Sequence, residues 1–154
     1  MLMGGLQELD PYQHEPIDAE AMVRALLESD VPCTDYPNAV VRSSILNDAN
    51  LLADRPCVVH DVGAPRDLGY GMWKIPLSIY VLSSDPDVGN RFSRYLYKRV
   101  MAWPWNTAGD VYGHVGTVTP IGFSRHGPDD MNLAYDVHVW EMTDFSVTAR
   151  NLQA

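Results

Sequence analysis

Residues 74–82 constrain the fold more than any other part of the sequence. Their apolar side chains fall at every second position: Ile75, Leu77, Ile79 and Val81. A period of two places alternate side chains on opposite faces, so it predicts a β-strand with one face against a core. Pro76 cannot donate a backbone hydrogen bond to a neighbouring strand. We therefore expect an edge or a bulge at its end of the strand.

A helix is predicted directly after this strand, over residues 86–103. Ser84 or Asp85 can cap its first turn, and Pro104 ends it. Its apolar residues share one arc of the helix: Val88, Phe92, Tyr95, Leu96, Val100 and Trp103. The opposite face carries the bases Arg91, Arg94 and Lys98. Arg99 falls inside the apolar arc, so it must extend its charge to solvent or pair with an acid at an interface.

The other elements are predicted from the same kinds of pattern. Residues 19–29 are predicted to form a helix with Asp18 near its start, because their apolar side chains recur at helical spacing until Pro32 closes the element. Strands are expected at residues 40–41, 57–62, 115–124 and 133–142, a helical turn or two at 45–52, and exposed loops at 63–71 and 125–132. In the strand 115–124, alternation assigns one face to Val115, Thr117, Thr119, Ile121 and Phe123.

This order of elements predicts an α+β fold, with two helices packed on one face of a mostly antiparallel sheet of four strands or slightly more. Residues 17–143 are expected to form a single domain. Residues 1–16 are interpreted as a flexible lead-in and residues 144–154 as a C-terminal tail.

The formal net charge of −9 argues against a general nucleic-acid binder, which needs a basic stripe. No basic n-region starts a secretory signal, because Arg24 is the first Lys or Arg, and the apolar runs are too short for a membrane helix. Cys33 and Cys57 lack CxxC spacing, so we interpret them as reduced thiols, with a single bridge between them left open.

Motifs that carry chemistry are missing from the sequence. No HxxxH, HExxH, Gly-x-Ser-x-Gly or P-loop pattern occurs, and we predict no catalytic residue, no cofactor and no metal. His138 and Asp136 share a strand face and are able to orient a ligand, but a structural histidine is the favoured interpretation. The chain is therefore expected not to be an enzyme.

Charge and aromatic residues point instead to contacts between copies. Acids dominate the first 20 residues, whereas four bases lie between positions 91 and 99. These are either two solvated faces or faces of neighbouring copies that attract each other. Trp105 is a candidate interface anchor. The residues predicted to contact a subunit or partner are Arg91, Arg94, Lys98, Arg99, Arg66, Asp67, Tyr70, Trp105, Asp129 and Asp130.

From Pro56 onward, the order and spacing of the segments resemble the tail terminator proteins of long-tailed phages. The features that carry the resemblance are the Cys57-Val58-Val59-His60 strand with its exit at Gly63, the strand 75–82 leading through Ser83-Ser84-Asp85, the helix 86–103, the strand 115–123, the turn at His126-Gly127-Pro128 and the strand Tyr135-Asp136-Val137-His138-Val139.

The resemblance implies a ring of identical subunits, commonly a hexamer, that caps the tail tube, stops its elongation and joins the tail to the head. It implies as partners further copies of the chain, the tail tube protein and head–tail connector proteins, with genomic double-stranded DNA passing through the lumen without specific binding. It also implies a virion protein, assembled in the host cytoplasm, without catalytic residues. The long segment 31–55, the acidic lead-in and the C-terminal extension depart from the family pattern and leave ring size and partner surfaces open.

Two other functions fit the same sequence. A different neck or connector subunit of the virion would share the structural role and differ only in its binding partner. A small enzyme or ligand-binding domain would need a concave pocket with convergent polar groups.

Overall fold

A computed structural model describes residues 15–42, 56–120, 122–127 and 137–151. Its helices are α2 (Ala19–Asp30), α3 (Pro86–Met101) and the short 3₁₀ helix η2 (Trp103–Trp105). Its strands are β1 (Val40–Arg42), β2 (Cys57–Val62), β3 (Arg66–Gly69), β4 (Met72–Ser83), β5 (His114–Thr119), β6 (Ser124–His126) and β7 (His138–Arg150).

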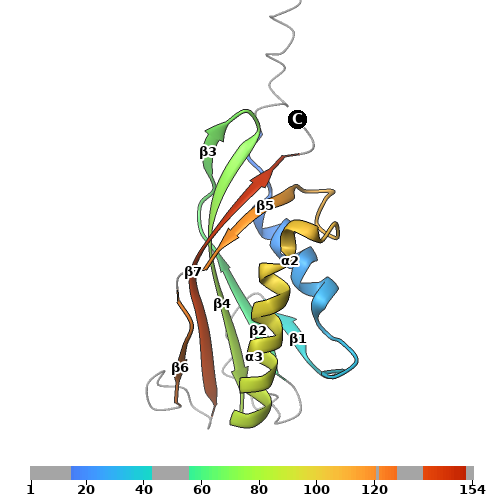
Figure 1. The fold of residues 1–154 in the computed structure, drawn as a ribbon, viewed down its shortest axis with the longest axis vertical. Coiled ribbons are helices and arrows are strands. Elements are labelled where there is room, and N and C mark those ends of the chain that lie inside the picture. The colour runs from blue at the N-terminus through green and yellow to red at the C-terminus, as the bar shows by residue number, and fades with distance from the viewer. Residues whose placement is uncertain (1–14, 43–55, 121, 128–136, 152–154) are drawn as a thin grey trace, which may run out of the picture.

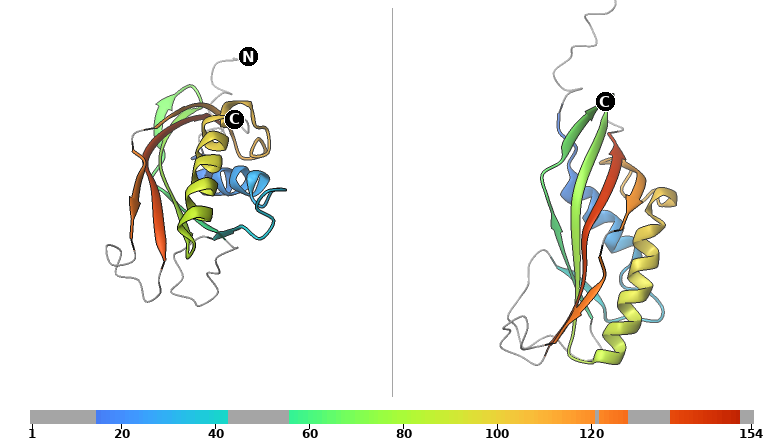
Figure 2. Two further views of the ribbon diagram at one scale, coloured as in Figure 1. Left: turned by 60° about the horizontal axis from the view of Figure 1, so that its bottom comes forward. Right: turned by 60° about the vertical axis from the view of Figure 1, so that its left-hand side comes forward.

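The strands form one sheet in the order β1-β2-β4-β7-β5, and β3 pairs with β4 while β6 pairs with β7. The pairing of β1 with β2 is parallel, and the other pairings within the described residues are antiparallel. Both α-helices cover the same face of this sheet (Figures 1 and 2). The predicted α+β class and helix arrangement are confirmed, and the sheet, expected to have four strands or slightly more, has seven in the described residues.

Sequence-encoded caps begin both helices where the patterns predict. The Asp18 carboxylate accepts a hydrogen bond from the backbone of Ala21, and that of Asp85 accepts from Asp87 and Val88. α3 ends at Met101, slightly earlier than predicted, and the chain tightens into η2 around Pro104.

The core lies between the helices and the sheet. α2 and α3 contribute Met22, Leu26, Phe92 and Leu96, and the strands contribute Ile79, Trp140 and Met142. The absence of a side chain at Gly89 allows α3 to approach the sheet, because a Cβ there would collide with the Trp140 ring. A second buried cluster, Cys57, Val59, Leu82, Val137 and Val139, comes from the strand positions that alternate with the helix-facing ones.

The expected C-terminal tail is wrong, because β7 continues to Arg150 and pairs with both β4 and β5. Phe145 and Val147 are buried, so the domain extends past residue 143. The reason is a β-bulge: Leu77 pairs with Phe145 while Ile79 pairs with Met142, so β7 holds one residue more than β4 over this interval. The extra residue changes the phase of the alternation and hides the continuity of the strand.

The same kind of irregularity corrects the strand predicted at 115–124. A register shift between Val115 and Thr117 makes Val115 and Val118 the core-facing residues of β5, and it leaves Thr117 and Thr119 exposed. The predicted strand is also split, with β5 ending at Thr119 and β6 starting at Ser124.

The loop predicted at 63–71 contains the strand β3, which forms a hairpin with β4. Pro76 lies between the last pair of β3 with β4, at Lys74, and the last pair of β2 with β4, at Leu77. β4 therefore changes partner at the residue that cannot donate a hydrogen bond. The helical turn predicted at 45–52 and the start of the strand predicted at 133 lie outside the described residues.

Candidate subunit-contact surfaces

A groove of about 460 Å³ lies along the exposed face of α3. Arg94 and Lys98 are one helical turn apart and both are exposed. Tyr97 and Phe123 complete the described lining. Two of the predicted contact residues are thus brought together with aromatic rings; we call this surface the α3 groove.

The aromatic part of the α3 groove rests on the core. The Tyr97 ring lies edge-on to the Phe123 ring, with 5.9 Å between centroids, and 6.1 Å from the ring of buried Phe145. Phe123 remains 42% exposed. Sequence reasoning missed Phe123 as a contact candidate because strict alternation assigned it to the same strand face as Val115.

Arg91 and Arg99 contact different groups from those around Arg94 and Lys98. The Arg91 Nε lies 3.4 Å from the Asp87 backbone oxygen, and its side chain borders another hollow beside Tyr36 and Val88. Arg99 donates through Nε to the Asp30 carboxylate at 2.8 Å. The four-residue basic face predicted from the sequence is therefore divided.

The Arg99–Asp30 pair is an internal connection between the two helices. The Asp30 side chain is only 1% exposed, and its position at the C-terminal end of α2 is electrostatically unfavourable for an acid. The hydrogen bond and charge of Asp30 raise the pKa of Arg99. Tyr95 donates to the Asp30 backbone oxygen at 2.9 Å, and burial, followed by a hydrogen bond with Cys33, raises the pKa of Tyr95 to about 12. The acid that Arg99 requires thus comes from its own chain.

β3 and β4 form a hairpin (Figure 1), and the pairing of Gly69 with Met72 leaves Tyr70 in its turn. Tyr70 is 99% exposed and has a positive φ of 58°, while Gly69 and Gly71 flank it with φ of 88° and 77°. The Asp67 carboxylate accepts a hydrogen bond from the Gly69 backbone at 2.7 Å and fixes the approach to the turn. Glycine adopts such angles freely, but a tyrosine there is strained by about 1–2 kcal/mol. Strain at a fully exposed aromatic residue points to a contact role.

A second exposed aromatic surface follows α3. Trp103 is fully buried, whereas Trp105 is 82% exposed, and Val111 and Tyr112 also expose their side chains. All three lie on the one connection between α3 and β5, and exposed apolar patches are typical of interaction sites. We call Trp105, Val111 and Tyr112 the η2 surface.

Hydrogen bonds hold the η2 surface on the domain. The two ring nitrogens of His114 face the Asp110 carboxylate at 2.7 Å and the Pro104 backbone oxygen at 3.1 Å. Asn106 donates to the Ser29 hydroxyl of α2 at 3.0 Å. The connection between η2 and β5 is therefore attached to the domain by hydrogen bonds near both of its ends.

His60 is buried beneath α2 and has no hydrogen-bond partner at either ring nitrogen in the part of the chain that the structure describes. Burial lowers the pKa of His60, and the positive charge of Arg24 acts in the same direction. The carboxylates of Glu20, Asp61 and Glu28 oppose this effect. A buried imidazole with a lowered pKa fits a structural histidine.

The two cysteines are free thiols, so the bridge that the sequence left open does not form. Burial raises the pKa of Cys57, and Arg42 only partly offsets this, so its thiol is poorly suited to be a nucleophile. His138 receives a hydrogen bond from Arg125, and His126 lies 2.9 Å from the Glu141 carboxylate. Asp136, the suggested partner of His138, lies outside the described residues.

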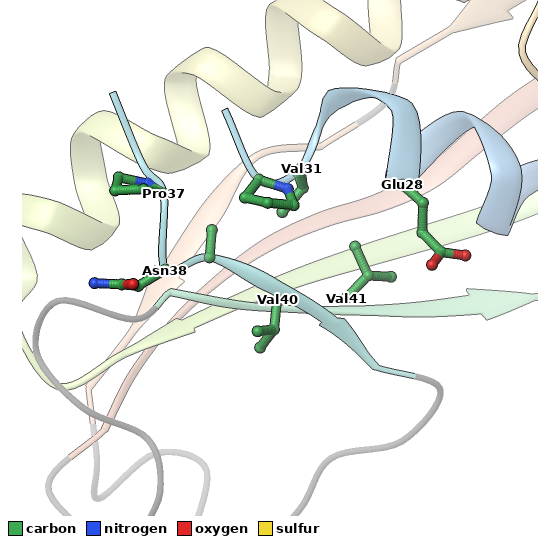
Figure 3. A pocket seen from close by; sticks show the side chains of 8 residues that line it. Glu28, Val31, Pro37, Asn38, Val40 and Val41 are labelled. Atoms are coloured by element: carbon green, nitrogen blue, oxygen red, sulfur yellow. The ribbon is translucent and has the colours of Figure 1, made fainter. Parts of the chain in front are cut away.

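A hollow of about 410 Å³ separates the end of α2 from β1, the terminal strand of the described sheet (Figure 3). Glu28 reaches it from α2 and Val41 from β1, and Glu28 is the one ionisable group among its described lining residues. Its described lining brings together no convergent acids, bases or nucleophiles.

Arg66 and Asp67 lie on β3 beside Tyr70, so the structure groups these three predicted contacts on one hairpin. Asp129 and Asp130 lie outside the described residues. Within the described ranges, no three His, Cys, Asp or Glu side chains are grouped to hold a metal ion. None of the described helices is long and apolar enough to span a bilayer.

Comparison of the sequence with models of known protein families and with curated proteins gave no match.

Proposed function

We propose that this chain is a structural subunit that assembles into a ring of identical copies and acts as the tail terminator of a long-tailed phage. The observation that carries the proposal is the exposure of two anchor-type side chains: Tyr70 in the β3–β4 turn, and Trp105 on a connection that hydrogen bonds attach to α2 and β5. Tyr and Trp are the residue types that dominate binding energy in protein interfaces.

The two anchors favour a ring over a closed dimer. Tyr70 projects from the β3–β4 hairpin, whereas Trp105 belongs to the η2 surface after α3. Head-to-tail contacts require two different patches on each copy, and a rotation that closes turns such contacts into a ring. The specific identity as a tail terminator rests on the resemblance of the segments from Pro56 onward.

The charge of the chain suits passage of DNA through the ring. A protein with a net charge of −9 repels phosphates overall, so DNA is expected to slide through the ring without specific binding. Rings in electron micrographs of the purified protein, and arrested growth when these rings are added to polymerising tail tube protein, are the expected results. Rings that leave tube growth unchanged would instead indicate a different neck subunit, and a monomer at high concentration would contradict both roles.

A further inference from the structure

We propose that the α3 groove binds the acidic N-terminal segment of a neighbouring copy, residues 6–12. This inference rests on the proposed ring assembly and identifies which parts of two copies meet. The segment has the sequence Leu-Gln-Glu-Leu-Asp-Pro-Tyr, and no Lys or Arg precedes Arg24. It lies outside the described residues, so the argument uses its sequence alone.

Charge spacing in the segment matches charge spacing in the groove. Arg94 and Lys98 are four residues apart on α3, which places their side chains about 6 Å apart on one face. Glu8 and Asp10 are two residues apart, and in an extended chain they lie on the same side, about 7 Å apart. Pro11 favours an extended conformation at Asp10. Two carboxylates can therefore face two bases in register.

Apolar residues of the segment match the rest of the groove. Leu9 alternates with the two acids, and Tyr12 follows Pro11. Tyr97 and Phe123 offer them an aromatic surface that is already supported by the core. A nucleic-acid backbone fits less well, because it has no apolar group for these rings and meets a protein of net charge −9.

Chain length indicates that the segment comes from another copy. Glu15 lies at the hairpin end of the sheet, since its backbone oxygen accepts from Asn151, and the Asn151 backbone in turn donates to Gly71. Phe123 lies beside Gly122, which packs against Thr143, level with Ser78 on β4. From Gly71 to Ser78 the strand rises about 23 Å. Tyr12, which is proposed to contact the aromatic part of the groove, is three residues before Glu15 and extends at most about 11 Å from it, so it falls short of Phe123 in its own chain.

The test uses full-length chains with reversed charges. R94E/K98E and E8K/D10K are each expected to lose assembly, because each puts like charges together, and the quadruple variant is expected to regain it. K74E/R150E makes the same net charge change at exposed positions outside the α3 groove and should assemble as the wild type does.

Mixing the two defective variants distinguishes binding between copies from binding within one chain. If the segment binds a neighbour, the mixture forms mixed oligomers, because each groove finds an oppositely charged segment on the other variant. If the segment binds its own chain, the mixture stays defective, which would overturn the proposal.

A direct binding measurement separates this inference from ring formation itself. A fluorescent peptide of residues 1–16, titrated into the full-length E8K/D10K variant, should bind about tenfold or more tightly than into the variant that also carries R94E/K98E, because the second variant has lost both ion pairs. F123S should weaken binding without changing its salt dependence. Equal binding by all these proteins would refute the groove as the docking site, even if wild-type rings form.

Discussion

Replacement of Tyr70 by Asn is expected to stabilise the fold and weaken the assembly. Tyr70 has a φ of 58° in a two-residue turn with Gly71, whose φ is 77°. Asn-Gly is the pair most favoured where both central residues have positive φ. Relief of the tyrosine strain should add about 1 kcal/mol to the free energy of unfolding. Because Tyr70 is 99% exposed, its side chain contributes little packing that the change could remove.

Assembly is expected to change in the opposite direction. A tyrosine that anchors an interface contributes about 2 kcal/mol or more, so each contact should weaken about 30-fold in Y70N. Unfolding in urea should be followed at a concentration where the protein is dissociated, because self-association adds to apparent stability. Assembly should be followed separately by sedimentation velocity.

Two control variants separate strain from contact. Y70F keeps both the backbone strain and the aromatic side chain, so it should behave like the wild type in both measurements. Y70A loses the aromatic side chain, but alanine is also strained at positive φ, so this variant should assemble poorly without the gain in stability. If Y70N assembled as well as wild type, Tyr70 would not be an interface anchor, and the link between its strain and its function would fail.

Three further predictions concern the internal pair, the buried histidine and the second anchor. R99A should lower the free energy of unfolding by about 2–3 kcal/mol in urea titrations, somewhat below the range for a fully buried pair because Arg99 itself is half-exposed. D30N/R99M should recover part of this loss. An unchanged free energy of unfolding in R99A would refute the structural role of the pair. His60 has a lowered pKa in the folded chain, so the unfolded chain binds the proton more tightly, and the stability that this shift contributes should be full above about pH 6.5 and fall as the pH drops below it. The fall should be smaller in H60L. An equal fall in both proteins would count against a buried neutral imidazole. W105S should change the free energy of unfolding by less than about 0.5 kcal/mol, because Trp105 is mostly exposed. The same variant should lower the fraction of oligomer seen in sedimentation velocity. An unchanged oligomer fraction would exclude Trp105 as an anchor.

Local patterns were sufficient to predict the regular elements. The caps at Asp18 and Asp85 and the alternation around Ile79 predicted α2, α3 and β4 with boundaries close to those observed. These signals depend on residues near in sequence, so they can be recognised without knowing the fold.

Irregular pairing could not be predicted from periodicity. The bulge opposite Ser78 shifts the phase of β7, and the shift after Val115 does the same in β5. Each break in phase resembles the end of a strand when only the sequence is read. The sheet is consequently larger than the alternation suggested, and Phe123 became a surface residue.

Contacts between residues far apart in the sequence determine which charged side chains remain available to bind a partner. Arg99 was expected either to reach solvent or to pair at an interface, but its guanidinium forms an ion pair with Asp30 of the same chain. No local pattern links these two positions, because they meet only when α2 and α3 pack on one sheet. Arg94 and Lys98 stayed exposed because no described acid faces them closely enough for an ion pair.

The mass of the purified protein in solution, measured by sedimentation equilibrium over a range of concentrations, tests the central claim most directly. The account predicts a discrete oligomer near six times the 17.2 kDa chain mass, about 103 kDa, that dissociates when Tyr70 or Trp105 is replaced. A single 17.2 kDa species at every concentration would contradict it.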